Sequence, residues 1–202
     1  PHQRVDVQAI DADFYVFSGH KVYGPTGVGV LYGKQSLLEA MPPWQGGGEM
    51  IDTVSFEHGT TFAALPHKFE AGTPAIAEVI ALGKALDWTE NVGLDAIGEW
   101  EQQLLTYSTQ QLQTIDGLRI LGTAEHKAAV VSFVVEGAHA QDIGLLIDQL
   151  GVAVRTGHHC AQPLLHHFGV EATCRASFAA YNTRDEIDIF VTSLRRVIDM
   201  VR

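Results

Sequence analysis

Two short apolar runs near the start of the chain are followed by a segment with the composition of a helix. Residues 13–18 (DFYVFS) and 27–32 (GVGVLY) are rich in aromatic and β-branched residues and each stops at a glycine, so both are predicted to be strands that end in tight turns. Residues 34–41 contain helix formers for about two turns before two prolines stop them. Residues 44–73 show little periodicity and are predicted to be mostly loop, of a length that is usually functional.

From residue 75 onward the apolar residues recur at helical spacing. Two helices joined at Gly93 are predicted from this spacing, the first from residue 75 and the second reaching residue 112. The rest of the chain is a new alternation of elements, with predicted strands at residues 118–121, 129–135, 152–155 and 175–180 and predicted helices at residues 140–150 and at the end of the chain. We therefore expect a domain boundary near residue 90.

The last predicted helix has the clearest local signal. Thr183 and, three residues later, Glu186 form the sequence pattern of a capping box. After them the apolar residues make one continuous stripe at positions 187, 190, 191, 194, 197, 198 and 201. The sequence thus predicts a helix that buries one face.

Composition excludes several classes of protein. Hydrophobic residues are 46% and charged residues 18%, which excludes a disordered tail protein. The 13 basic and 24 acidic residues give a net charge of −11 without a basic block, which argues against nucleic acid or an anionic membrane as the main partner. No apolar run approaches the roughly 20 residues that span a bilayer. A small-molecule substrate or a protein partner is left.

The ends of the chain and its cysteines bear on where the protein works. Two cysteines are too few for a secreted disulfide framework and no charged-then-apolar leader is present, so a cytoplasmic location is expected. The chain begins with Pro1 rather than methionine. We therefore expect it to be part of a longer protein.

A lysine follows the first predicted strand. In Ser18-Gly19-His20-Lys21 the amine would be held near a strand end, where a lysine in its neutral form can make a Schiff base. Ser18 and His20 could donate hydrogen bonds to a phosphate, and Gly19 would let the backbone come close to that phosphate. The alternative is a lysine on the solvent side of a turn, which is where most lysines lie.

A cysteine follows two histidines in a predicted loop after another strand. Cys160 lies beside two imidazoles, and a thiolate favoured there would be a nucleophile. One alternative is a buried, inert cysteine. The other is a metal site drawn from His158, His159, Cys160, His166, His167 and Cys174. Adjacent side chains diverge and the spacing matches no zinc pattern, so a metal is not expected.

Anion-binding groups are predicted at three more positions. Arg155 and Arg175 lie at the ends of predicted strands, where a rigid guanidinium can bind a carboxylate through two hydrogen bonds. The alternative for either is an ordinary ion pair with one of the surplus acids. Thr73 ends a long loop just before a helix, so its hydroxyl and the amides of Gly72 and Thr73 could face an anion, or could simply cap the helix.

The order of these segments resembles the second half of a cysteine desulfurase. The matching segments are S-G-H-K at 18–21, F-E-A-G-T-P at 69–74, R-T-G-H-H-C-A-Q-P at 155–163 and C-R-A-S-F-A-A-Y-N-T at 174–183. The cysteine segment without an inserted loop is similar to the Suf and Csd type of the class-V aminotransferase superfamily. The resemblance implies an α/β protein of the fold type I pyridoxal 5'-phosphate (PLP) enzymes. Residues 1–90 would be the C-terminal part of the large cofactor domain, and 91–202 the small α+β C-terminal domain.

The resemblance also implies which residues bind the cofactor. Lys21 matches the lysine that holds PLP as an internal aldimine and later moves protons. Ser18 and His20 match phosphate ligands, and Thr73 matches the residue that reaches the phosphate in the neighbouring subunit of a homodimer. The groups that pair with and stack on the cofactor ring precede the lysine in the family and cannot be assigned here. We therefore expect these 202 residues alone to bind PLP weakly and to be inactive.

The reaction implied is removal of sulfur from L-cysteine, which leaves L-alanine and a persulfide on Cys160 for iron-sulfur cluster assembly or another sulfur-transfer pathway. Arg175 matches the residue that binds the substrate carboxylate, and Arg155 is the next candidate for that role. A sulfur-acceptor protein of the SufE or CsdE type is the implied partner.

Three alternatives remain open at this point. A selenocysteine lyase acting on L-selenocysteine would keep the whole set of residues. Another fold type I lyase or aminotransferase would use Lys21 and Arg175 but not Cys160. The third is a catalytically inactive fragment of such an enzyme.

Overall fold

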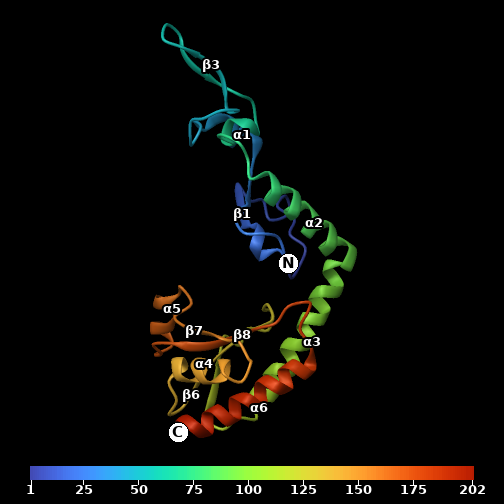
Figure 1. Cartoon of the computed structure of the whole chain (residues 1–202), viewed down its shortest axis with the longest axis vertical. Helices are drawn as coiled ribbons and strands as arrows, with labels where there is room; N and C mark the ends of the chain where they lie inside the picture. The colour runs from blue at the N-terminus through green and yellow to red at the C-terminus, as the bar shows by residue number, and fades with distance from the viewer. The chain divides into compact units, whose positions relative to one another are not determined.

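The computed structural model describes residues 1–202 and divides into two compact units. Pro1 and Gln3–Leu94 make up the first unit, and His2 with Asp95–Arg202 make up the second (Figure 1). The assignment of residues 1–90 and 91–202 to a large and a small domain stays a prediction.

The first unit begins with a two-stranded antiparallel sheet. Strand β1 (Phe14–Ser18) pairs with β2 (Gly29–Gly33) so that Phe14 lies opposite Gly33, and a short 3-10 helix, η1 (Gly19–Lys21), follows β1 directly. Helix α1 (Gln35–Ala40) comes next. The two predicted strands and the short predicted helix are confirmed.

The prediction for residues 44–73 was wrong in part. Strands β3 (Ile51–Ser55) and β4 (Gly59–Phe62) form an antiparallel hairpin, and a 3-10 helix, η2 (His67–Phe69), follows it. All of β4 and all but the last residue of β3 are exposed. Because neither face of the hairpin is buried, the sequence lacks the alternation of apolar and polar residues by which a half-buried strand is recognised.

Helix α2 (Ile76–Val92) closes the first unit and α3 (Leu94–Leu112) opens the second. Gly93 between them has φ 92°, a left-handed value that glycine adopts without strain, and its amide donates to the carbonyl of Thr89. The two predicted helices and the glycine junction are confirmed.

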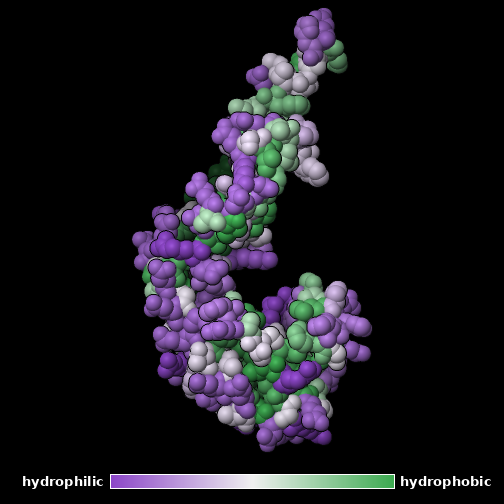
Figure 2. All heavy atoms as spheres, turned by 180° about the vertical axis from the view of Figure 1, so that it is seen from behind, coloured by the Kyte–Doolittle hydropathy of each residue, from purple (hydrophilic) through white to green (hydrophobic).

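The first unit has a small core and an apolar surface. Met50 and Leu82 are its buried apolar side chains. Figure 2 shows apolar side chains on its surface, and the large exposed ones include Val16, Leu31, Ile76, Val79 and Ile80.

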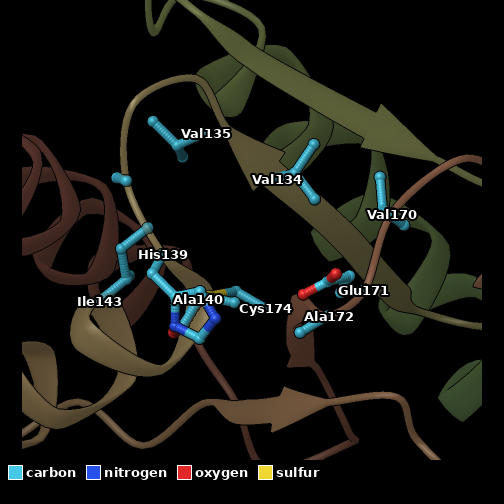
Figure 3. A pocket seen from close by; sticks show the side chains of 10 residues that line it. Val134, Val135, His139, Ala140, Ile143, Val170, Glu171, Ala172 and Cys174 are labelled. Carbon is cyan, nitrogen blue, oxygen red and sulfur yellow. The ribbon is translucent and has the colours of Figure 1, made fainter.

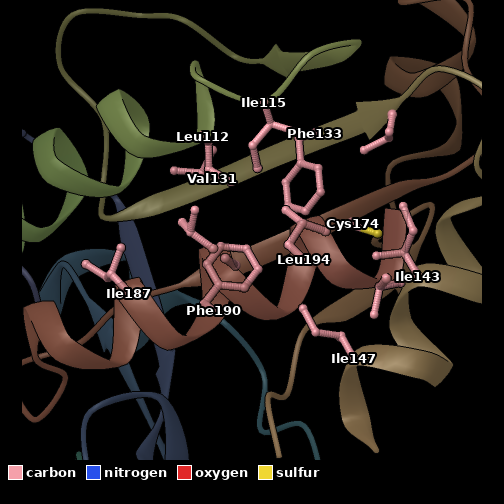
Figure 4. Packing of buried hydrophobic residues seen from close by; sticks show 14 of the residues in the cluster. Leu112, Ile115, Val131, Phe133, Ile143, Ile147, Cys174, Ile187, Phe190 and Leu194 are labelled. Atoms are coloured by element: carbon pink, nitrogen blue, oxygen red, sulfur yellow. The ribbon is translucent and has the colours of Figure 1, made fainter. Parts of the chain in front are cut away.

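The second unit is a four-stranded antiparallel sheet packed against helices. Its strands are β5 (Leu118–Leu121), β6 (Val130–Val135), β7 (Arg155–Gly157) and β8 (Thr173–Ser177), in the order β5-β6-β8-β7. Its helices besides α3 are α4 (Ala140–Asp148), α5 (Gln162–His167) and α6 (Arg184–Val201). Figure 4 shows Phe133 of β6 packed among α6 and α4 residues such as Leu194 and Ile147, each of them fully buried. This face of the sheet is the core of the unit.

Helix α6 begins as its sequence predicts. The Thr183 hydroxyl accepts from the amide of Glu186, and the Glu186 carboxylate accepts from the amide of Thr183 at 2.8 Å. The hydrogen bond from the Thr183 amide, and next that from the Asn182 side chain, hold the pKa of Glu186 below its ordinary value. The capping box and the buried apolar stripe are confirmed.

Two strands of this sheet are shifted from their predicted positions. The run predicted at 152–155 is a strand only from Arg155, since Val152 and Val154 pack against the core and the Val152 amide donates to Ile147 at the end of α4. The strand predicted at 175–180 runs from Thr173 to Ser177. Arg155 therefore begins its strand and Arg175 lies in the middle of β8, which corrects the strand-end positions expected for both.

No helix of the chain is long and apolar enough to cross a membrane.

Candidate active site

The Lys21 segment is held by tight backbone packing. The Gly19 amide donates to the carbonyl of Val28 at 2.8 Å, and the Gly19 carbonyl accepts from the amides of Val22 and Gly24. A Cβ at Gly19 would lie 2.8 Å from Val28 Cγ1 and 3.1 Å from the Pro25 carbonyl oxygen. Only glycine fits there without a shift of the backbone, so the turn that carries Lys21 has a defined path.

Lys21 is exposed and has no partner for its amine. The other four lysines all have one: Lys34 and Lys84 bind carboxylates at 2.8 Å, and Lys68 and Lys127 donate to backbone carbonyls. Ser18, at the start of the same turn, does not use its hydroxyl to cap η1. The structure thus leaves Lys21 free, with hydrogen-bonding groups of Ser18 and His20 in the same turn.

No hydrogen bond joins Thr73 to the turn that carries Lys21. Thr73 is exposed in the segment before α2, whose N-cap residue Ala75 has no side-chain hydrogen bond. The Gly72 amide donates to the carbonyl of Gly48 at 2.9 Å. The expectation that the Gly72 amide could face an anion is therefore wrong, because that donor is already used.

Cys160 stands at the tip of a tight turn after β7. The amide of Ala161 donates to the carbonyl of His158 at 2.8 Å, and the two central residues, His159 and Cys160, have φ of 53° and 58°. Two consecutive left-handed residues are typical of a type I′ turn and cost energy for side chains other than glycine. The cysteine is exposed and has the backbone strain that is frequent at functional positions.

His159 is tied to the sheet. Its Nε2 and the hydroxyl of Thr173 lie 2.8 Å apart, and Thr173 is buried. Burial, and next the positive charge of Arg175, lower the pKa of His159 below its ordinary value. The imidazole therefore has a reduced tendency to take up a proton, and its Nδ1 is buried without a hydrogen bond.

The two arginines lie directly opposite each other. The register of β7 and β8 pairs Arg155 with Arg175, and neither forms an ion pair, although the chain carries 24 acidic residues. The Nε of Arg175 is buried without a hydrogen bond, and Arg155 has a single partner, the Cys160 sulfur. The alternative that these residues are ordinary ion pairs is therefore wrong, and the arrangement can bind an anion.

The second cysteine lies on the other face of the same strand pair. Cys174 is buried, its thiol donates to the carbonyl of Ala140 at 3.3 Å, and burial raises its pKa to about 12. Figure 3 shows it in the wall of a cavity of about 220 Å³ with Val134 and Ala172. Cys160 and the arginines do not line this cavity, so it is separate from the candidate site.

Comparison with known proteins identifies the family. A sequence model described as aminotransferase class-V matches residues 1–190. The chain belongs to this family. It is 55% identical over 196 residues to a cysteine desulfurase of Serratia proteamaculans, covering 97% of this chain and 48% of that protein. It is also 55% identical to a probable cysteine desulfurase of Xylella fastidiosa, covering 98% and 47%.

Solved structures agree with this family assignment. The cysteine desulfurase CsdA from Escherichia coli superposes with a TM-score of 0.94 at 44% identity and covers 100% of this chain and 50% of that one. A cysteine desulfurase from Thermococcus onnurineus also reaches a TM-score of 0.94, at 36% identity, with 98% and 50% covered. The expected α/β fold of the class-V family is confirmed, and the chain spans about half the length of the relatives it matches.

Sequence reasoning found the site residues one by one but missed two relations between them. It did not find that Arg155 faces Arg175, because strand register depends on segments about twenty residues apart. It also did not find the contact of Arg155 with Cys160. The interval of five residues between them was the available signal, since a strand followed by a tight turn can bring such residues together.

Proposed function

We propose that the protein carrying this chain is a cysteine desulfurase, which removes sulfur from L-cysteine and leaves L-alanine and a persulfide on Cys160. The relatives at 53–55% identity bear that name. The observation that carries the proposal is the exposed Cys160 in contact with Arg155, which lies opposite Arg175, while neither arginine has a carboxylate partner. One side chain can accept a sulfur and another can hold an amino-acid carboxylate.

The residues of the Lys21 turn fit PLP, the cofactor of this enzyme class. Lys21 is the lysine with no protein partner, so its amine is available for a covalent bond to an aldehyde. Ser18 and His20 would bind the phosphate, and Thr73 would do so for a neighbouring subunit. When bound, the cofactor supplies an electron sink for the bonds broken at the substrate.

Three residues of this chain then divide the reaction. Arg175 binds the substrate carboxylate with two parallel hydrogen bonds, which orients the substrate. Lys21 removes and returns a proton at the α-carbon. The Cys160 thiolate attacks the substrate sulfur, so that an S–S bond forms while the Cβ–S bond breaks. The electron pair of the broken Cβ–S bond stays with Cβ, which takes up a proton and completes alanine.

The persulfide requires an acceptor, for which we propose a SufE- or CsdE-type protein in the cytoplasm, with the enzyme acting as a homodimer. Sulfur would pass from there to iron-sulfur clusters or another pathway. The exposed position of Cys160 at a turn tip supports transfer to another protein, since an acceptor thiol must reach the persulfide sulfur.

The direct test replaces each cysteine in turn in the full-length enzyme. Cys160→Ala should abolish alanine formation and sulfide release from L-cysteine while the cofactor absorbance stays intact, and Cys174→Ala, the matched control, should retain activity. Full activity in Cys160→Ala would refute the function. If Cys160→Ala acted on L-selenocysteine but not on L-cysteine, the function would not be refuted, because selenium leaves more easily than sulfur.

The lysine is tested independently by reduction. Borohydride treatment of the holoenzyme should fix the cofactor to the peptide that contains Lys21. Lys21→Ala should lose both the label and turnover, whereas Lys84→Ala, a variant of an exposed lysine paired with Asp87, should keep both. A label on Lys34 or Lys84 would overturn the assignment of the first unit.

A further inference from the structure

The only partner that the Arg155 guanidinium has is the sulfur of Cys160. Its Nη2 donates to Sγ at 3.7 Å, within the range of a hydrogen bond to sulfur, and the two residues are five apart in sequence. Arg155 begins β7, the strand at the edge of the sheet, and Cys160 follows at the tip of the turn. The left-handed backbone of His159 and Cys160 directs the chain back so that this contact forms.

The two arginines differ in their surroundings. Arg175 lies in the middle of β8, is half-buried and has a buried Nε without a partner. Arg155 is exposed at the edge and already donates to sulfur. One guanidinium satisfies both oxygens of one carboxylate, so a substrate carboxylate bound by Arg175 leaves Arg155 for a second acceptor.

Cationic or titratable groups lie close to this turn. Arg155 donates to the Cys160 sulfur, and the charges of Arg175, Arg155 and His158 act on His159. Helix α5, which follows the turn, contains His166 and His167 and no carboxylate. The Cys160 sulfur is the acceptor that this chain itself supplies to Arg155.

We propose that Arg155 is a positioning residue for Cys160, whose sulfur it holds at the turn tip through this hydrogen bond, while Arg175 alone binds the substrate carboxylate. This inference rests on the proposed function, because it assigns Arg155 a part in the attack by Cys160. It replaces the expectation that Arg155 is the second candidate for the carboxylate.

The test measures alkylation of Cys160 by iodoacetamide in the full chain at pH 7, read by peptide mass spectrometry. In Arg155→Gln the rate of alkylation at pH 7 should fall about three- to tenfold, as expected when one hydrogen bond that holds the sulfur is lost. Arg155→Lys keeps the charge without the planar guanidinium, so its rate of alkylation should lie between those of Arg155→Gln and the unaltered chain. Arg119→Gln, an exposed arginine on β5, should match the unaltered chain.

Two results would overturn the proposal. One is a rate of alkylation in Arg155→Gln equal to that of the unaltered chain. The other is an equal fall of this rate in Arg119→Gln, which would indicate a general effect of net charge.

Steady-state kinetics of the full-length holoenzyme give a second readout. Arg155→Gln should lower kcat with little change in KM for L-cysteine, and Arg175→Gln should raise KM. An equal rise of KM in both variants would make Arg155 a carboxylate ligand and sink the proposal. Alkylation needs neither cofactor nor turnover. If the enzyme released no sulfur from L-cysteine, but Arg155→Gln still slowed the alkylation of Cys160, the proposed function would be refuted and the role of the Arg155 contact would stand.

Discussion

Replacement of Arg175 by methionine should stabilise the second unit while it removes the carboxylate-binding group. Two like charges directly opposite in an antiparallel pair cost about 0.2–1 kcal/mol, and Arg155 is paired with Arg175 without an anion between them. The buried Nε of Arg175 adds a desolvation cost of roughly 1 kcal/mol because it has no hydrogen bond. Methionine keeps most of the apolar stem, so little packing is lost.

The expected gain is about 1 kcal/mol in the free energy of unfolding, or a rise of roughly 4 °C in Tm for a unit of this size. Scanning calorimetry of the full chain measures it, and hydrogen exchange of the β6 and β8 amides assigns the gain to the second unit. Arg119→Met on β5 is the matched control, since its charge is not opposite another arginine. Increasing salt should reduce the difference in Tm between Arg175→Met and the unaltered chain, because salt screens the repulsion of partly exposed charges.

A lower Tm in Arg175→Met would contradict this expectation. That result would mean that the Arg175 side chain contributes more through its contacts than its unpaired charge costs. An equal gain in Arg119→Met would refute it in another way, because the relief would then come from total charge and not from the cross-strand pair. A confirmed gain together with a raised KM would be the trade-off between stability and activity that is expected of a binding group.

Three further outcomes follow from the second unit. Iodoacetamide at pH 8 should label Cys160 and spare Cys174 in the folded chain, because burial raises the Cys174 pKa to about 12, and both should react in denaturant. The pKa of His159 is lowered in the folded state, so the unfolded chain binds this proton more readily. The free energy of unfolding should therefore fall as pH drops below the ordinary value of 6.5. Urea titrations at pH 7.5 and 5.5 should show a smaller fall of this free energy in His159→Asn than in the unaltered chain. Thr183→Ala should cost about 1 kcal/mol by removing the cap of α6, measured by urea unfolding, and Thr183→Ser should restore it.

The elements that the sequence determined are those whose signals are local. The capping box at Thr183 and the apolar stripe after it define α6, because each depends on residues within a few turns of one helix. Gly93 ends α2 for a similarly local reason, its left-handed backbone. The residue types of the site, Lys21 after a strand and Cys160 in a loop, were also found from the sequence.

Other features depend on partners distant in the sequence. The β3–β4 hairpin was missed because neither of its faces is buried, so pairing of the strands is its only signal. The starts of β7 and β8 were misplaced for a related reason. Val152 looks like part of a strand by composition, but it packs against the core, and β7 starts only where β8 pairs with it.

The candidate site shows the same division between chemistry and geometry. The sequence alone determined which groups are present, because reactivity belongs to residue types: an amine at Lys21, a thiol at Cys160, guanidinium groups at Arg155 and Arg175. The tertiary structure decided what those groups contact. The register of β7 on β8 sets the two arginines opposite each other, and the turn that follows brings the Cys160 sulfur back to Arg155. Register and turn geometry are set by pairing and packing over the whole unit, which no local pattern of residues contains.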